Sequence, residues 1–155
     1  MATSTLIQFL EAGEKASTSN RSQEETFLAG GAIAAGDWVA LDTTQTGANK
    51  ALYVLETAAA SGDAKVCGVA LAAAAAGAQV RVCIGGYCKS ASVANTTAAG
   101  SPLMTSGATA GMAIAATYIG DGSGAAAVAL PISCGVALTT AGVPNTAEVW
   151  VTTRF

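Results

Sequence analysis

The sequence predicts an all-β fold, a small barrel or sandwich with an internal two-fold repeat, preceded by an extended N-terminal arm. The pentapeptide Cys-Gly-Val-Ala-Leu occurs at residues 67–71 and again at 134–138. Short apolar runs recur roughly every 8–15 residues between glycine-containing turns, which is typical of sandwiches and barrels. With 155 residues the chain is long enough for one domain with its own core.

The repeat extends beyond the pentapeptide. Residues 35–41 (AGDWVAL) resemble residues 99–105 (AGSPLMT). Downstream of each pentapeptide follows a triplet with valine at both ends, at residues 80–82 in the first copy and 149–151 in the second. The connection between pentapeptide and triplet is therefore longer by two residues in the second copy. Self-similarity of this kind indicates a duplicated unit. We therefore expect a β-domain over residues 31–155, with halves of about 31–93 and 94–155 that bury their apolar faces together.

Residues 1–30 are expected to form the arm, because a polar spacer separates two small apolar groups there. Such a segment can become ordered on a partner. The alternative is a frayed terminus with one edge strand at residues 25–29. The apolar residues that would contact the partner are Leu6, Ile7, Phe9, Leu10, Phe27 and Leu28.

From residue 31 onward, turn signals such as Gly36-Asp37 and Gly85-Gly86 separate the apolar runs. Alanine favours helix at residues 70–76, but so short a segment is marginal in water, and we expect a loop with at most one helical turn. Strands are predicted at residues 38–41, 51–55, 65–71, 79–84, 87–93, 112–119, 127–132, 135–138 and 148–153.

Composition narrows the classes of function. The net charge is −3 and the seven basic residues are scattered, so no basic patch for nucleic acid is expected. No run of about 20 apolar residues predicts a membrane span. The N-terminus lacks the pattern of a secretory signal, and synthesis and assembly in a cytoplasm are expected.

The chain has no histidine, which excludes Ser-His-Asp catalysis and imidazole metal sites. We expect the chain to bind no cofactor and no metal, and to have no enzymatic activity.

The four cysteines offer one candidate site. Cys67 and Cys134 occupy equivalent repeat positions and are expected to be buried structural thiols. Cys83 and Cys88 flank Gly85-Gly86, which predicts a hairpin with the two thiols paired across the strands. A cytoplasmic setting favours free thiols, and a disulfide is the alternative. Four scattered cysteines are a weak zinc signal.

Carboxylates could be paired as Asp37 with Asp42, or as Asp63 with Glu56. Each lies beside a glycine or threonine turn, where acidic residues commonly cap backbone amides. Nothing in the spacing places two of these acids across a cleft, so turn capping is the expected role.

Three segments together, residues 35–41 (AGDWVAL), 67–71 (CGVAL) and 76–82 (AGAQVRV) with Gly85, resemble the head decoration, or cement, proteins of tailed bacteriophages. The resemblance covers about residues 30–155 and is a pattern of small and apolar positions. It implies a small β-rich protein, often trimeric, that binds the major capsid protein on the outer capsid surface of the virion. There it would bridge neighbouring capsid subunits and stabilise the shell. The family has no catalytic residues to transfer.

The composition agrees with such a role. Between Lys89 and Glu148 the only charged residue is Asp121, so this stretch offers either a protein-contact surface or a polar, uncharged surface facing solvent. An oligomer on a repeating lattice would convert weak contacts into tight retention. Another self-assembling subunit of a tail, fibre or surface layer is the alternative, and a ligand-binding barrel is a further one.

Overall fold

The computed structural model describes residues 22–116 and 133–152, and it confirms the all-β fold. Nine strands form one continuous sheet in the order β1-β3-β2-β4-β5-β9-β8-β6-β7. A 3-10 helix, η2, at Gly47–Ala51 is the only helical element in these ranges. The strands are β1 (Ser22–Ala29), β2 (Trp38–Leu41), β3 (Tyr53–Glu56), β4 (Val66–Ala70), β5 (Gln79–Ser92), β6 (Pro102–Thr105), β7 (Ala113–Ala115), β8 (Gly135–Ala137) and β9 (Thr146–Val151).

The first five strands close on themselves. β1 pairs with β5 along most of its length, and the ring continues through β4, β2 and β3. The ring closes where β1 runs parallel to β3, through only two residue pairs, Leu28 with Tyr53 and Ala29 with Val54. We call this ring barrel one. Its seam between β1 and β3 is therefore paired at one end only.

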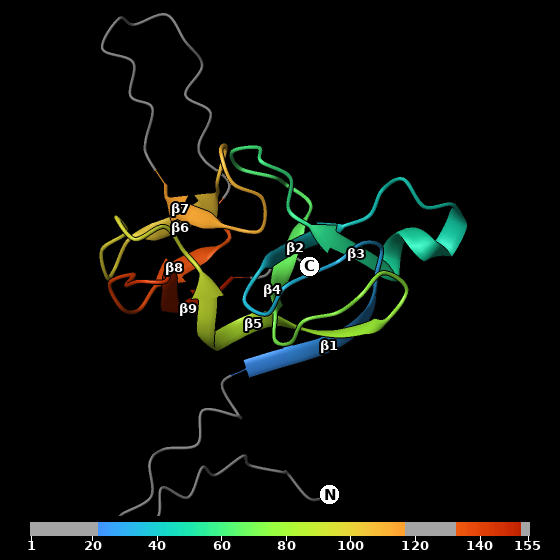
Figure 1. The fold of residues 1–155 in the computed structure, drawn as a ribbon, viewed down its shortest axis with the longest axis horizontal. Coiled ribbons are helices and arrows are strands. Elements are labelled where there is room, and N and C mark those ends of the chain that lie inside the picture. Colours follow the sequence, from blue (N-terminus) through green and yellow to red (C-terminus); the bar gives the residue numbers. More distant parts are fainter. Residues whose placement is uncertain (1–21, 117–132, 153–155) are drawn as a thin grey trace, which may run out of the picture.

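The remaining strands form a second ring of the same topology, barrel two. The C-terminal half of β5 pairs with β9, and the ring continues through β8, β6 and β7. A parallel bridge between Val93 and Ala113 closes it, in the place of the parallel β1–β3 contact. β5, 14 residues long, thus belongs to both rings and joins the two halves of the molecule (Figure 1).

Matching hydrogen bonds confirm the predicted internal repeat. Gly36 N–H donates to the Ala70 carbonyl at 2.8 Å, and Gly100 N–H donates to the Ala137 carbonyl at 2.7 Å. These donors and acceptors stand at equivalent positions of the two sequence copies. The two barrels are therefore copies of one unit, held by the same backbone contacts.

The predicted alignment of the two sequence copies was wrong for the last strand of the repeat. Val69 pairs with Cys83 in barrel one, and the equivalent Val136 pairs with Trp150 in barrel two. Residues 80–82 thus match residues 147–149, not 149–151, and the second connection has no extra residues. Inward positions on β9 still alternate, since Ala147, Val149 and Val151 are buried.

The division into halves also differs from the prediction. Barrel one begins at Ser22 and shares β5 with barrel two, so no boundary falls between residues 93 and 94. Residues 22–29 are a barrel strand, which restricts any arm to residues 1–21, outside the described residues. Of the two alternatives for this segment, the strand is correct for residues 25–29. β1 is longer than predicted, however, and it is a strand of the barrel wall rather than an edge strand.

Two other strand predictions need correction. Cys83 and Cys88 do not flank a hairpin turn, because β5 runs without interruption through Gly85 and Gly86. The apolar pattern does not predict β6 at Pro102–Thr105, although residues 99–105 resemble the β2 segment. Residues 70–76 contain no helix, as expected. The strand predicted at residues 127–132 lies outside the described residues.

Each barrel has an apolar core, and barrel one also contributes to the core of barrel two. The interior of barrel one contains residues such as Phe27, Val39 and Val82. Trp38, Val69 and Cys83 point out of barrel one and pack in the core cluster of barrel two. This row is completely buried, so the two barrels form a single hydrophobic unit.

Candidate functional site

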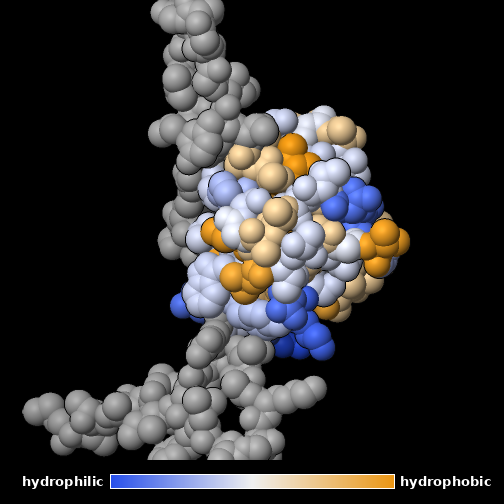
Figure 2. All heavy atoms as spheres, turned by 90° about the vertical axis from the view of Figure 1, so that its left-hand side faces the viewer, coloured by the Kyte–Doolittle hydropathy of each residue, from blue (hydrophilic) through white to orange (hydrophobic). Residues whose placement is uncertain are grey.

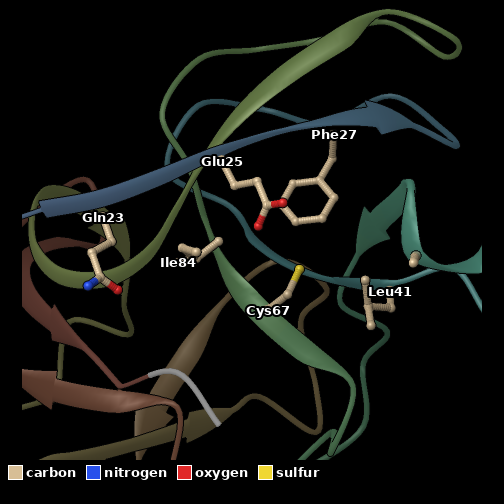
Figure 3. Close-up of a pocket in the computed structure, with 7 residues that line it drawn as sticks. Gln23, Glu25, Phe27, Leu41, Cys67 and Ile84 are labelled. Carbon is tan, nitrogen blue, oxygen red and sulfur yellow. The ribbon is translucent and has the colours of Figure 1, made fainter. Parts of the chain in front are cut away.

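Barrel one has a cavity of about 250 Å³ at its open end. Glu25 and Phe27 of β1 point toward Cys67 of β4, and Ile84 and Leu41 complete the apolar wall (Figure 3). The cavity lies beside the stretch of β1 that is not paired with β3. It is lined by Gln23, Glu25, Phe27, Leu41, Ala51, Cys67 and Ile84.

The same end of barrel two is covered by barrel one. Thr105, the counterpart of Leu41, is buried, and its hydroxyl donates to the Ala60 carbonyl and accepts from the Asp63 N–H, both at 2.8 Å. Ala60 and Asp63 belong to the connection between β3 and β4 of barrel one. Barrel one has no such cover among the described residues, which explains why its end is hollow.

A row of partly exposed apolar side chains crosses the outer face of barrel two. Pro102 pairs with Val136, and Val136 pairs with Trp150. Directly opposite residues of an antiparallel pair point to the same face. Trp150 is 40% exposed, which is unusual for so large an aromatic side chain in a chain with few charges. The face of barrel two is mainly pale and tan, with strongly hydrophilic residues toward the margins (Figure 2).

The structure brings two of these carboxylates close together, and they form neither of the pairs considered from the sequence. Asp37 and Glu56 approach each other beside Gly111, where an added Cβ would lie 2.7 Å from Glu56 Oε1 and 2.9 Å from Asp37 Cγ. Burial raises the pKa of Asp37, against the effect of the Ala34 N–H, which donates to its carboxylate at 2.7 Å. Glu56 is largely exposed, and its slight desolvation and the Asp37 charge raise its pKa. Asp37 thus caps a turn, as expected.

The other two acids considered from sequence also cap turns. Asp42 accepts hydrogen bonds from the side chains of Thr44 and Gln45 and from the Thr44 N–H at 3.0 Å, and these bonds lower its pKa. Asp63 accepts from the Lys65 N–H at 2.9 Å. The turn-capping prediction is therefore confirmed for both residues.

The thiols are free and buried. Cys67 donates to the Val39 carbonyl and Cys134 donates to the Leu103 carbonyl, each at 3.5 Å. Burial raises the pKa of both thiols to about 12. They are structural thiols at equivalent places, as expected.

Cys83 and Cys88 come close although no hairpin joins them. Hydrogen bonding from the Cys88 thiol lowers the pKa of Cys83, and the pKa of Cys88 is raised by the same contact. Cys83 also lies 3.5 Å from the Ser22 hydroxyl. The two residues therefore form a thiol pair within one bent strand, buried where the two barrels meet.

The sequence prediction of partner-binding residues has a mixed outcome. Leu6, Ile7, Phe9 and Leu10 lie outside the described residues. Phe27 is a core residue of barrel one and Leu28 is half-buried in β1, so neither is a free anchor. The sequence pattern did not predict the Trp150 row or the cavity. The aligned copies contained a signal for both features, because they carry different residues at equivalent positions. Leu41 corresponds to Thr105, and Cys83 corresponds to Trp150.

Comparison of the sequence with models of known protein families and with curated proteins finds no match. Within residues 22–116 and 133–152, no helix is long and apolar enough to cross a membrane. The same ranges contain no group of three or more Cys, Asp or Glu side chains placed to hold a metal ion.

Proposed function

We propose that this chain is a structural virion protein that binds the outer surface of a phage capsid and stabilises the shell by bridging neighbouring capsid subunits. The observation that supports it is the surface of barrel two, a row of apolar side chains on a face with few charges. Uncharged apolar surface suits contact with another protein better than capture of a polar substrate. The resemblance of residues 30–155 to phage decoration proteins gives the class of partner, a major capsid protein.

The proposed role requires no catalysis and no cofactor. Asp42 and Asp63 are engaged in turns and the described thiols are buried. A homotrimer assembled in the host cytoplasm and then attached to the virion would hold several weak contacts at once, and multivalency would make attachment tight.

A binding assay with capsid shells tests this proposal. The probe is the expanded, DNA-free shell of the major capsid protein encoded in the same genome. Co-sedimentation should show saturable binding and a higher melting temperature of the shell. A variant with Leu6, Ile7, Phe9 and Leu10 all changed to serine tests the arm, and it keeps β1 intact. No binding to expanded shells at any protein concentration would contradict the proposal.

A second candidate is a subunit of a tail, fibre or surface layer. It is favoured by one observation, that the exposed row and the open cavity lie on different barrels, because unlike surfaces permit open-ended growth. Light scattering distinguishes the two candidates. A discrete oligomer supports the decoration protein, and continuous growth without any capsid supports the alternative.

A further inference from the structure

The two barrels of one chain show how a barrel of this kind binds another. The outward row of barrel one, Trp38, Val69 and Cys83, is buried against barrel two. The Trp38 ring reaches a position inside barrel two, since an added Cβ on Gly135 would lie 3.3 Å from Trp38 Cη2. The contact therefore has two sides. One is the outward row of barrel one together with its β3–β4 connection, and the other is the end of barrel two that contains Gly135 and Thr105.

Each side of this contact occurs a second time in the molecule. The row Pro102, Val136 and Trp150 on barrel two is equivalent to Trp38, Val69 and Cys83, by sequence alignment and by strand pairing. The cavity of barrel one is equivalent to the end of barrel two that barrel one covers. Among the described residues, neither the second row nor the cavity has a covering element.

We propose that the chain associates head to tail with a second copy of itself, and that the Pro102, Val136 and Trp150 row of one copy covers the barrel-one cavity of the next. The contact repeats between chains the arrangement that already joins the barrels within a chain. In the contact between chains Trp150 supplies the aromatic ring, as Trp38 does in the contact within a chain. The two rings lie at opposite ends of their rows, since Trp38 corresponds to Pro102 and Trp150 to Cys83. A cavity of about 250 Å³ accommodates an aromatic side chain.

The chemistry of the two surfaces supports this contact. The cavity is lined by the apolar side chains of Phe27, Leu41, Ala51, Cys67 and Ile84, with Gln23 and Glu25 as its polar members. Burial of a partly exposed tryptophan in a mainly apolar pocket is typical of an interface hot spot. Because the two surfaces differ and lie on different barrels, the contact is heterologous and produces a closed ring or an open chain. The inference does not rest on the proposed capsid partner.

Sedimentation velocity over a concentration series tests the row. The wild-type chain should associate reversibly, and Trp150→Asp should weaken association on the order of 30-fold or more. Val143→Asp is the matched control, since Val143 is 91% exposed and outside the row, and it should behave as wild type. Circular dichroism confirms that each variant is folded. A wild-type chain that stays monomeric up to about 1 mM would overturn the proposal.

Disulfide trapping tests the direction of the contact. Chains carrying Trp150→Cys are mixed with chains carrying Gln23→Cys, whose position lines the cavity. Both chains also carry Cys67→Ala, because the free Cys67 thiol lines the same cavity and could itself react with the introduced thiol. Cross-linking should occur in the mixture and not in either chain alone. Cross-linking of the Trp150→Cys chain with itself would show a face-to-face dimer and would overturn the proposal.

The residues before β1 are the competing occupant of the cavity, since the described chain starts at Ser22, next to Gln23. The full-length variant with Leu6, Ile7, Phe9 and Leu10 changed to serine decides between them. Association equal to wild type supports the second copy. Association that appears only in this variant would show that the chain's own N-terminal segment covers the cavity, and would overturn the proposal.

Discussion

Trp38 and Gly135 meet at the junction of the two barrels. The Trp38 indole packs against the place that a side chain on Gly135 would occupy. A Cβ on Gly135 would lie 3.3 Å from Trp38 Cη2 and 2.5 Å from the Trp150 carbonyl oxygen. Gly68, its counterpart in barrel one, has the same close approach to the Cys83 carbonyl. The glycine of each Cys-Gly-Val-Ala-Leu copy is thus required by the adjacent backbone.

Gly135→Ala should destabilise the protein by about 1–3 kcal/mol, because the backbone of β9 must move to admit the methyl group. Urea unfolding measures the change. Gly142→Ala is the control, since nothing lies within 4 Å of an added Cβ there, and it should change stability by less than about 0.5 kcal/mol. Equal stabilities of the two variants would show that the close approach is absent.

Thr105→Val should reduce the free energy of unfolding by about 1–3 kcal/mol, because it leaves the Asp63 N–H and the Ala60 carbonyl without their partner. Thr57→Val provides the contrast. The buried Thr57 hydroxyl has no hydrogen-bond partner among the described residues, so valine should leave stability unchanged or raise it by up to about 1 kcal/mol. A loss as large in Thr57→Val as in Thr105→Val would contradict this account.

Alkaline pH should destabilise the fold through Cys67 and Cys134. Their pKa rises from 9.0 to about 12 on folding, so their contribution is complete below pH 9 and is lost as pH rises toward 12. The slope is at most about 1.4 kcal/mol per pH unit for each thiol. Urea titrations between pH 8 and pH 11 should show a shallower slope for Cys67→Ala and for Cys134→Ala than for wild type. Identical slopes would mean that these thiols ionise in the folded state.

Glu56→Gln should make the protein slightly more stable at pH 7. The pKa of Glu56 is raised in the folded state, so its contribution is complete below the unfolded pKa and is lost as pH rises through the folded pKa. The gain should be a few tenths of a kcal/mol at most, since the side chain is exposed and solvent screens it. Thermal melting at pH 4 and pH 7 should show the gain at pH 7 only. A gain at both values would point to a cause other than charge.

Sequence alone located the duplicated unit and much of the strand pattern. The segments at residues 38–41, 66–70 and 135–137 follow from local apolar runs bounded by turns. The burial of Cys67 and Cys134 follows from their place in those runs. These features are local, so a single stretch of sequence contains the information.

The path of β5 required tertiary contacts. Gly85-Gly86 satisfies a hairpin turn as well as a bent strand, because glycine adopts both conformations, and Gly86 has a φ of 83°. Pairing decides between them. Gly86 and Tyr87 pair with Val151 and Trp150 of β9, and this long-range contact extends the strand into barrel two.

The same reason applies to the candidate surfaces. The sequence determined a duplicated, weakly charged all-β chain with equivalent glycines and thiols. Only the tertiary structure decided that Phe27 is in a core, that Trp38 is buried and that Trp150 is partly exposed. The two tryptophans lie in similar short apolar runs. Their exposure depends on which barrel has another barrel beside it, and local sequence does not encode that neighbour.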